Sequence, residues 1–308
     1  MNKGLLNLFL QTLPYLSSMV LPIFLIQVSS ENTYGKYVIF HSLLGIAGSL
    51  VTLGIGKETA RYLSSIDDIG SRLYLIIVTI RRVYVALIST IVVVLIANFF
   101  LLFNNNILLS GILMMVSVAQ LTLIGDFFRY SSYFFVYSLL ISSVSGSMLL
   151  WTFYGVQSEA TYTSEELITA YAIISLICSS AAFCCYLIKY RALIKTASSP
   201  SLLAEIKFGF PLILSYLITA MVFTGDRYFV QIYLGFESVA IYAVLFIITT
   251  APITVGRLLV VLVQPALNNL HACFAQAEYE KLLNATIITY LGVVILWLPI
   301  CHFYGDIL

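Results

Sequence analysis

Five charged residues lie within or at the ends of long apolar stretches, where a charge is costly and usually serves a function. They are Asp126, Arg129, Asp226, Arg227 and Arg257. An Arg side chain carries a planar, permanently charged fork of donors, which suits phosphate oxygens better than the point charge of Lys does. We therefore predict that these five side chains bind a polar, charged ligand, and that Arg227 and Arg257 meet its anionic part.

Cysteine and histidine form no recognisable metal or redox motif. The cysteines stand in apolar stretches without CxxC or Cys/His spacing, and the histidines are far apart. The sequence also lacks a nucleophile elbow, a phosphate-binding loop and a dinucleotide fingerprint. We therefore expect neither an enzyme nor a bound cofactor or metal.

The composition shows what kind of protein must position these charges. Of the 308 residues, 61% are hydrophobic and 9% are charged, whereas soluble domains are about 45–50% apolar and about 25% charged. Counting stretches of about 20 apolar residues predicts about nine membrane-spanning helices, at roughly 7–28, 37–56, 76–103, 107–128, 133–154, 166–188, 208–234, 239–262 and 285–303. The fold class that we predict is an all-α, polytopic membrane helix bundle.

Basic residues in the loops predict the orientation of this bundle. If the N-terminus is cytoplasmic, 13 of the 15 Lys and Arg residues fall on the inner side, leaving only Lys36 and Arg227 toward the outer side. Cytoplasmic loops are normally enriched in Lys and Arg. We therefore predict a cytoplasmic N-terminus.

A weak internal repeat suggests two lobes related by pseudo-symmetry. Tyr242, which opens the eighth span, lies 205 residues after Tyr37, which opens the second. Such repeats are common in transporters. The prediction is an N-terminal six-helix lobe at 1–195 and the first three helices of a second lobe at 205–308. On this reading the second lobe is incomplete, and we expect the chain to be truncated at its C-terminus.

Position along the helices leaves two interpretations open for the charges in the second half. Counting about 1.5 Å per residue from position 208 puts Asp226 about 27 Å along its span, near the outer edge of an apolar layer about 30 Å thick. Asp226 and Arg227 are then either an anchor pair at the interface or part of a cavity, and adjacent residues need different partners. Arg257 is either a snorkelling anchor or a phosphate ligand.

The charges in the first half have similar alternatives. Asp126 and Arg129 are three residues apart on one helix face, so they either neutralise each other or line the inner mouth of a cavity. Arg81 and Arg82 stand near the start of the span at 76–103, and we interpret both as topology anchors.

Two blocks of sequence resemble a known family. The stretch 208–244, FGFPLILSYLITAMVFTGDRYFVQIYLGFESVAIYAV, carries a Pro near the start of a helix, then Asp-Arg-Tyr, Leu-Gly and Tyr: Pro211, Asp226 to Tyr228, Leu234-Gly235 and Tyr242. This pattern resembles helices seven and eight of the Wzx-type O-antigen and capsule flippases of the multidrug/oligosaccharidyl-lipid/polysaccharide exporter superfamily. The stretch 34–65 is similar to helix two of the same family and the loop that follows it.

The resemblance implies a function. The expected cargo is an undecaprenyl-pyrophosphate-linked oligosaccharide, moved across the bacterial cytoplasmic (inner) membrane by alternating access and driven by an ion gradient. Membrane lipid, and the polymerase and chain-length proteins of glycan assembly, are the expected partners. Two alternatives stay open, namely a multidrug or cation exporter of the same superfamily and a non-transporting membrane component of a glycan-assembly complex. Short outer loops argue against a third, a membrane-embedded polymerase.

Overall fold

The structure, a computed structural model, is built from helices. It describes residues 12, 17, 20–52, 54–55, 59, 63, 66, 68–101, 105–130, 133–196, 199, 201–250, 252–253, 255–256, 259, 263 and 276–305. The helices are α2 (Glu31–Val51), α4 (Ile69–Leu101), α5 (Asn105–Tyr130), α6 (Phe134–Gln157), α7 (Ser164–Tyr190), the short η1 (Arg191–Leu193), α8 (Leu202–Thr249) and α10 (Gln276–Gly305). No strand occurs within the described ranges, so the all-α fold class is confirmed.

Most of these helices are long and apolar enough to cross a membrane. Among the described residues there are seven such segments: Ile69–Leu95, Ile107–Arg129, Phe135–Gln157, Ser164–Leu193, Leu202–Val222, Thr224–Ile247 and Gln276–Trp297. Seven of the predicted spans overlap them. Half of the predicted span at 7–28 lies outside the described residues, and the span at 37–56 overlaps α2. The chain is therefore a polytopic membrane helix bundle.

Polar side chains fix where several helices begin. The Ser30 side chain accepts from the backbone N–H of Thr33 (3.2 Å) and starts α2. Thr163 and Glu166 form a capping box at the start of α7. Asp68 precedes α4 and accepts from both the backbone and the hydroxyl of Ser71, each at 2.8 Å. These two bonds lower the pKa of Asp68, because they favour its charged form.

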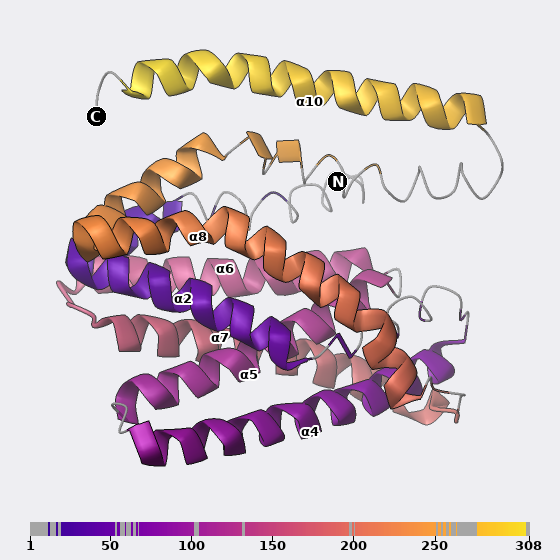
Figure 1. Ribbon diagram of the computed structural model, residues 1–308. Helices are drawn as coiled ribbons and strands as arrows, with labels where there is room; N and C mark the ends of the chain where they lie inside the picture. The colour runs from indigo at the N-terminus through magenta and orange to yellow at the C-terminus, as the bar shows by residue number, and fades with distance from the viewer. Residues whose placement is uncertain are drawn as a thin grey trace.

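Helix α8 is two helices joined at a sharp bend. Gly235 has φ 83° and ψ 176°, which is not helical, and Gly is the residue that adopts positive φ without strain. The ribbon of α8 turns back on itself at this bend (Figure 1). The bend lies between the predicted spans 208–234 and 239–262, so the division between them is confirmed.

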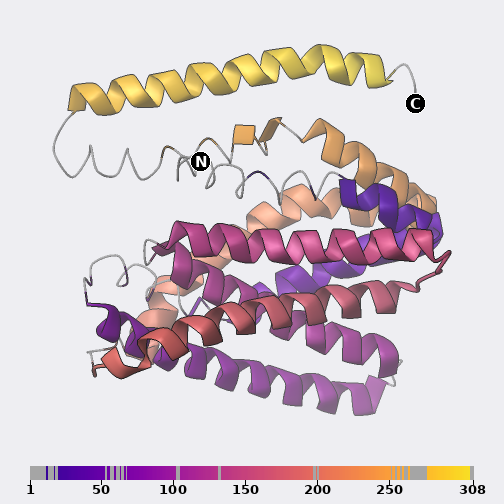
Figure 2. The same cartoon turned by 180° about the vertical axis from the view of Figure 1, so that it is seen from behind.

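Helix α8 approaches α2 and the residues just after it closely at two points. A Cβ atom on Gly35 would lie only 1.9 Å from the carbonyl oxygen of Phe236, and one on Gly209 would lie 2.4 Å from the carbonyl oxygen of Gly54. Only residues without side chains permit such approaches. Helix α8 is therefore held at its bend against the start of α2, and near its own start against a residue just after α2, while α10 lies apart from the main bundle (Figures 1 and 2).

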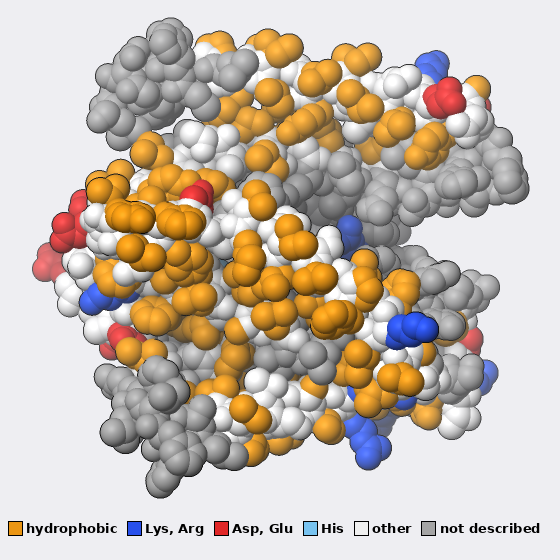
Figure 3. All heavy atoms as spheres, in the orientation of Figure 1, with side chains coloured by type: hydrophobic (Ala, Val, Ile, Leu, Met, Phe, Trp, Pro, Cys, Tyr) orange, Lys and Arg blue, Asp and Glu red, His pale blue; other side chains and the backbone are white. Residues whose placement is uncertain are grey.

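The two ends of the bundle carry opposite charge. Acidic side chains gather where α2 and α7 begin, whereas most basic side chains lie where α4 and α8 begin and α5 and α7 end (Figure 3). We call these the acidic end and the basic end. The acidic end carries Glu31, Glu159, Glu165, Glu166 and Glu237, and the basic end carries Arg72, Arg81, Arg82, Arg129, Lys189, Arg191, Lys195 and Lys207. Which end faces the cytoplasm stays a prediction.

Candidate functional site

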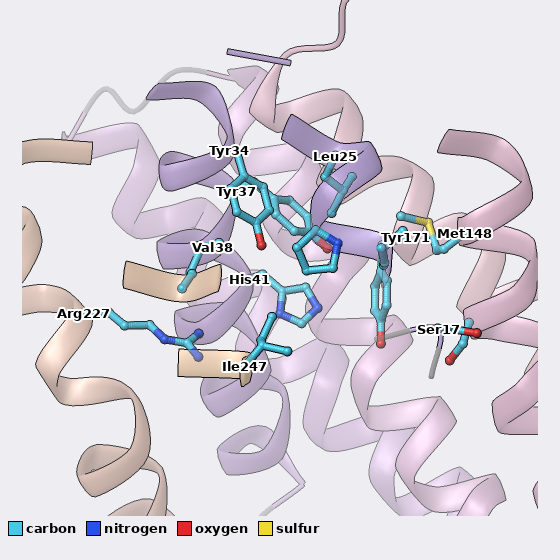
Figure 4. A pocket seen from close by; sticks show the side chains of 14 residues that line it. Ser17, Leu25, Tyr34, Tyr37, Val38, His41, Met148, Tyr171, Arg227 and Ile247 are labelled. Atoms are coloured by element: carbon cyan, nitrogen blue, oxygen red, sulfur yellow. The ribbon is translucent and has the colours of Figure 1, made fainter. Parts of the chain in front are cut away.

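A cavity of about 290 Å³ lies between α2, α6, α7 and both arms of α8. Figure 4 shows Arg227 reaching into it from α8, with His41 and Tyr171 across the space. The lining residues are Ser17, Leu21, Pro22, Leu25, Tyr34, Tyr37, Val38, His41, Ser145, Met148, Tyr171, Arg227, Ala243 and Ile247. Arg227 is the one permanently charged side chain among these 14, so the cavity is electropositive.

Aromatic rings form one wall of the cavity. Tyr34, Tyr37 and His41 are spaced by three and four residues, which puts them on one face of α2. Their ring centroids are 6.2 Å apart between Tyr34 and Tyr37 and 5.4 Å apart between Tyr37 and His41. Tyr171 of α7 meets the edge of His41 at 4.9 Å. The wall thus combines ring faces, which can stack on a sugar, with hydroxyl and imidazole groups, which can form hydrogen bonds with it.

Arg227 faces the interior of the bundle. Its Nη1 donates to the hydroxyl of Ser42 at 3.1 Å, and its guanidinium lies over the ring of Phe246, 5.1 Å from the centroid. Nε is buried and has no hydrogen-bond partner among the described residues. A buried donor without a partner is unfavourable. Arg227 also lines the cavity, so its guanidinium carries unused donor capacity beside that space.

Asp226 has different partners from its neighbour, as adjacency in a helix predicts. The hydroxyl of Tyr242 on the second arm of α8 donates to its Oδ2, and the backbone N–H of Arg227 donates to Oδ1 at 2.8 Å. Asp226 does not line the cavity. It ties the two arms of α8 together and so positions Arg227.

The surroundings of Asp226 and Arg227 favour a place inside the bundle over an anchor pair at the interface, and their depth in the membrane stays a prediction. The first arm of α8 continues to Gly235, which is about 13 Å beyond Asp226 at about 1.5 Å per residue. Ser42, which binds Arg227, lies about 17 Å from the start of α2 on the same scale. Both residues are partly buried, and the Arg227 side chain points toward α2 rather than out to water (Figure 4).

Two of the other predicted site residues, Asp126 and Arg129, are not brought to this cavity. Asp126 and Arg129 lie near the end of α5, half-buried, and neither lines it. Arg257 lies outside the described residues. The cavity therefore unites Arg227 with the aromatic residues of α2 and α7, which the sequence reasoning did not select. The spacing of Tyr34, Tyr37 and His41 was the available signal.

A second polar cluster, at the basic end, was also missed. Glu205 of α8 is completely buried, and its Oε2 lies 3.0 Å from Nη1 of Arg82 on α4. The interpretation of Arg81 and Arg82 as topology anchors stays a prediction; the structure adds that Arg82 pairs with Glu205, whereas Arg81 is exposed. Elsewhere, no group of three or more His, Cys, Asp or Glu side chains in the described ranges could hold a metal ion.

Comparison with known proteins adds no assignment. No protein-family model, curated protein or solved structure matches the chain.

Proposed function

We propose that the chain is a flippase of the Wzx type, which moves undecaprenyl-pyrophosphate-linked oligosaccharide repeat units for O-antigen or capsule across the bacterial inner membrane. The observation that supports this most is the partly unsatisfied Arg227 guanidinium beside an aromatic, hydroxyl-bearing cavity within an apolar helix bundle. An intramembrane Arg that faces the protein interior usually serves a substrate pathway.

The cargo and the cavity have matching chemistry. A pyrophosphate offers several anionic oxygens to Arg227, whose charge-assisted hydrogen bonds are stronger than neutral ones. The rings and hydroxyls of Tyr34, Tyr37 and Tyr171 suit a sugar. A volume of about 290 Å³ holds part of the headgroup rather than the whole oligosaccharide, so we assign to it the phosphate and the adjoining sugar, with the lipid tail remaining in the bilayer.

Transport would follow from alternating exposure of the cavity to the two ends of the bundle. We propose that the basic end is cytoplasmic, in keeping with the positive-inside rule, that the N-terminus lies on the same side, and that an ion gradient drives the cycle. Polymerase and chain-length proteins of glycan assembly would receive the cargo.

The charge of the cavity favours this cargo over a cationic drug. An exporter of cations would place carboxylates where its substrate binds, but no Asp or Glu occurs among the described residues that line the cavity. The nearby carboxylate of Asp226 is engaged by Tyr242. Of the alternatives within the superfamily, an anionic cargo is the better fit.

Equilibrium binding of undecaprenyl pyrophosphate to the purified chain in detergent tests the proposal. Arg227→Gln should weaken binding about 10- to 100-fold, because a charge-assisted hydrogen bond contributes about 1.5–3 kcal/mol. Arg227→Lys should recover part of the loss, since it keeps the charge without the fork. Lys281→Gln removes an exposed cation from α10 and should change little.

Undecaprenol, which has the same tail without phosphate, provides the ligand control. Equal affinities for undecaprenol and undecaprenyl pyrophosphate, or an unchanged affinity in Arg227→Gln, would contradict the proposal.

A further inference from the structure

A buried network at the basic end joins α8 to the rest of the bundle. Glu205 is 0% exposed, and its Oε2 lies 3.0 Å from Arg82 Nη1. Its Oε1 accepts a hydrogen bond from the Thr59 hydroxyl at 2.9 Å, and the Thr79 hydroxyl lies 2.9 Å from that of Thr59. We call these four residues the basic-end latch. None of them lines the cavity beside Arg227.

The latch holds the start of α8 closed against its neighbours. Gly209 lies one turn after Glu205 on the same face of α8, and its backbone touches that of Gly54. The start of α8 cannot move away at this end without separating Glu205 from Arg82. An isolated carboxylate left in an apolar interior is strongly unfavourable. The Glu205 carboxylate can therefore leave the Arg82 guanidinium only when another group replaces their ion pair or when Glu205 reaches water.

The two partners differ in their accessibility. The Arg82 side chain is 22% exposed, whereas that of Glu205 is 0% exposed. Arg81 and Lys207, which are both exposed, add positive charge to the same end. An anion approaching this end is therefore attracted to it and can reach the Arg82 guanidinium, while Glu205 remains covered.

We propose that Arg82 is an entry site for a phosphate or diphosphate headgroup, and that this anion opens the latch by displacing Glu205 from the guanidinium. A diphosphate carries more charge than one carboxylate and can engage the Arg fork through two oxygens. The freed Glu205 then moves with the start of α8 into water. The same helix carries Arg227 about 33 Å further along its axis at about 1.5 Å per residue, so movement at the start of α8 acts on the helix that also lines the cavity.

This inference uses the proposed function only for the identity of the cargo. It explains why the bundle would open at this end when an anionic headgroup is present and stay closed otherwise.

Binding of inorganic pyrophosphate, measured by calorimetry at constant ionic strength, tests the entry site. The measurement uses the purified full chain carrying Arg227→Gln, so that the cavity does not contribute. Glu205→Gln should raise the affinity about tenfold, because it removes the competing carboxylate, and Arg82→Gln should lower it about tenfold or more. Arg81→Gln is the matched control, an exposed neighbour outside the latch, and should have a smaller effect.

An affinity that is the same with and without the Arg82 side chain would overturn the entry site. A Glu205→Gln chain that binds no more tightly than its parent would overturn the competition between Glu205 and the anion.

Thiol labelling tests the opening itself. Thr79, which is 0% exposed, is replaced by Cys in a chain without other cysteines, and its rate of reaction with a small cationic thiosulfonate reagent is measured. Pyrophosphate should accelerate labelling about tenfold, and an equal ionic strength of sodium chloride should not. The double variant Arg82→Glu with Glu205→Arg keeps an ion pair but places the Arg at the buried position. Pyrophosphate cannot reach this buried Arg, so the Cys that replaces Thr79 should be labelled slowly with or without pyrophosphate.

Acceleration by pyrophosphate that persists in the double variant, or that is missing in the parent, would refute the latch. Neither measurement involves transport or the cavity. If they succeed while Arg227→Gln leaves binding of undecaprenyl pyrophosphate unchanged, the latch stands and the cargo assignment is wrong.

Discussion

The contact between α2 and α8 can be tested by adding one methyl group at Gly35. A Cβ atom at this position would lie 1.9 Å from the carbonyl oxygen of Phe236 and 2.7 Å from its carbonyl carbon. The same addition at Gly45, also in α2, would meet nothing within 4 Å. Gly35→Ala and Gly45→Ala are therefore matched variants of one helix, and only one of them is obstructed.

The difference between these variants isolates the cost of the obstruction. A carbon–oxygen contact normally needs about 3.3 Å, so Gly35→Ala must separate the backbones of α2 and α8 by roughly 1.4 Å locally. Overpacking of this kind costs about 1–3 kcal/mol. Replacing Gly by Ala within a helix also stabilises it by about 0.5–1 kcal/mol, but this gain is common to both variants. We expect Gly35→Ala to be less stable than Gly45→Ala by about 1–3 kcal/mol.

Reversible unfolding in mixed micelles titrated with sodium dodecyl sulfate, followed by far-ultraviolet circular dichroism, provides the measurement. Gly45→Ala should unfold at the same detergent fraction as the parent or a higher one, and Gly35→Ala at a lower one. Equal stability of the two variants would show that the backbones of α2 and α8 do not meet at Phe236. The positions of α2 and α8 around the cavity would then be wrong.

Three further predictions concern orientation, a residue outside the described ranges and the support of Arg227. Reporter fusions should give an outer-side signal at Glu159 and a cytoplasmic signal at Ser198, and the reverse pair of signals would overturn the predicted topology. In a flippase-deficient strain, Arg257→Gln should abolish surface polysaccharide and Arg257→Lys should restore part of it, whereas normal polysaccharide with Arg257→Gln would identify this residue as an anchor. Asp226→Asn and Tyr242→Phe should each destabilise the chain by about 1–2 kcal/mol, and a double-mutant cycle that shows no coupling would contradict the bond between them.

The fold followed from the sequence because lipid imposes simple rules on it. Apolar stretches of about 20 residues predict spans, and the break between Leu234 and Val239 identified the bend at Gly235. Helix ends were less predictable. The predicted span begins at residue 208, just after the charged residues Glu205 and Lys207, but α8 begins at Leu202. The pairing with Arg82 that lets Glu205 be buried joins residues far apart in sequence, and hydropathy carries no information about it.

The site was predicted only in part, for a related reason. Arg227 was identified because an intramembrane charge is rare, but its depth depends on where α8 ends and which helix it meets. Contact with Ser42 on α2 decides that it faces inward. The aromatic wall escaped notice because Tyr is abundant in the chain and at membrane interfaces, so that three residues at helical spacing did not stand out. The pseudo-symmetry of the two lobes stays a prediction.

Translocation in proteoliposomes tests the central claim most directly. The chain is reconstituted with an undecaprenyl-pyrophosphate-linked oligosaccharide on the inner leaflet, under an imposed ion gradient, and a glycan-cleaving enzyme outside the vesicles reports each headgroup that crosses. The proposed function predicts cleavage that rises with time for the parent chain and for Lys281→Gln, and cleavage no faster than in empty vesicles for Arg227→Gln. Parent vesicles that match empty ones, or Arg227→Gln vesicles that match the parent, would contradict it.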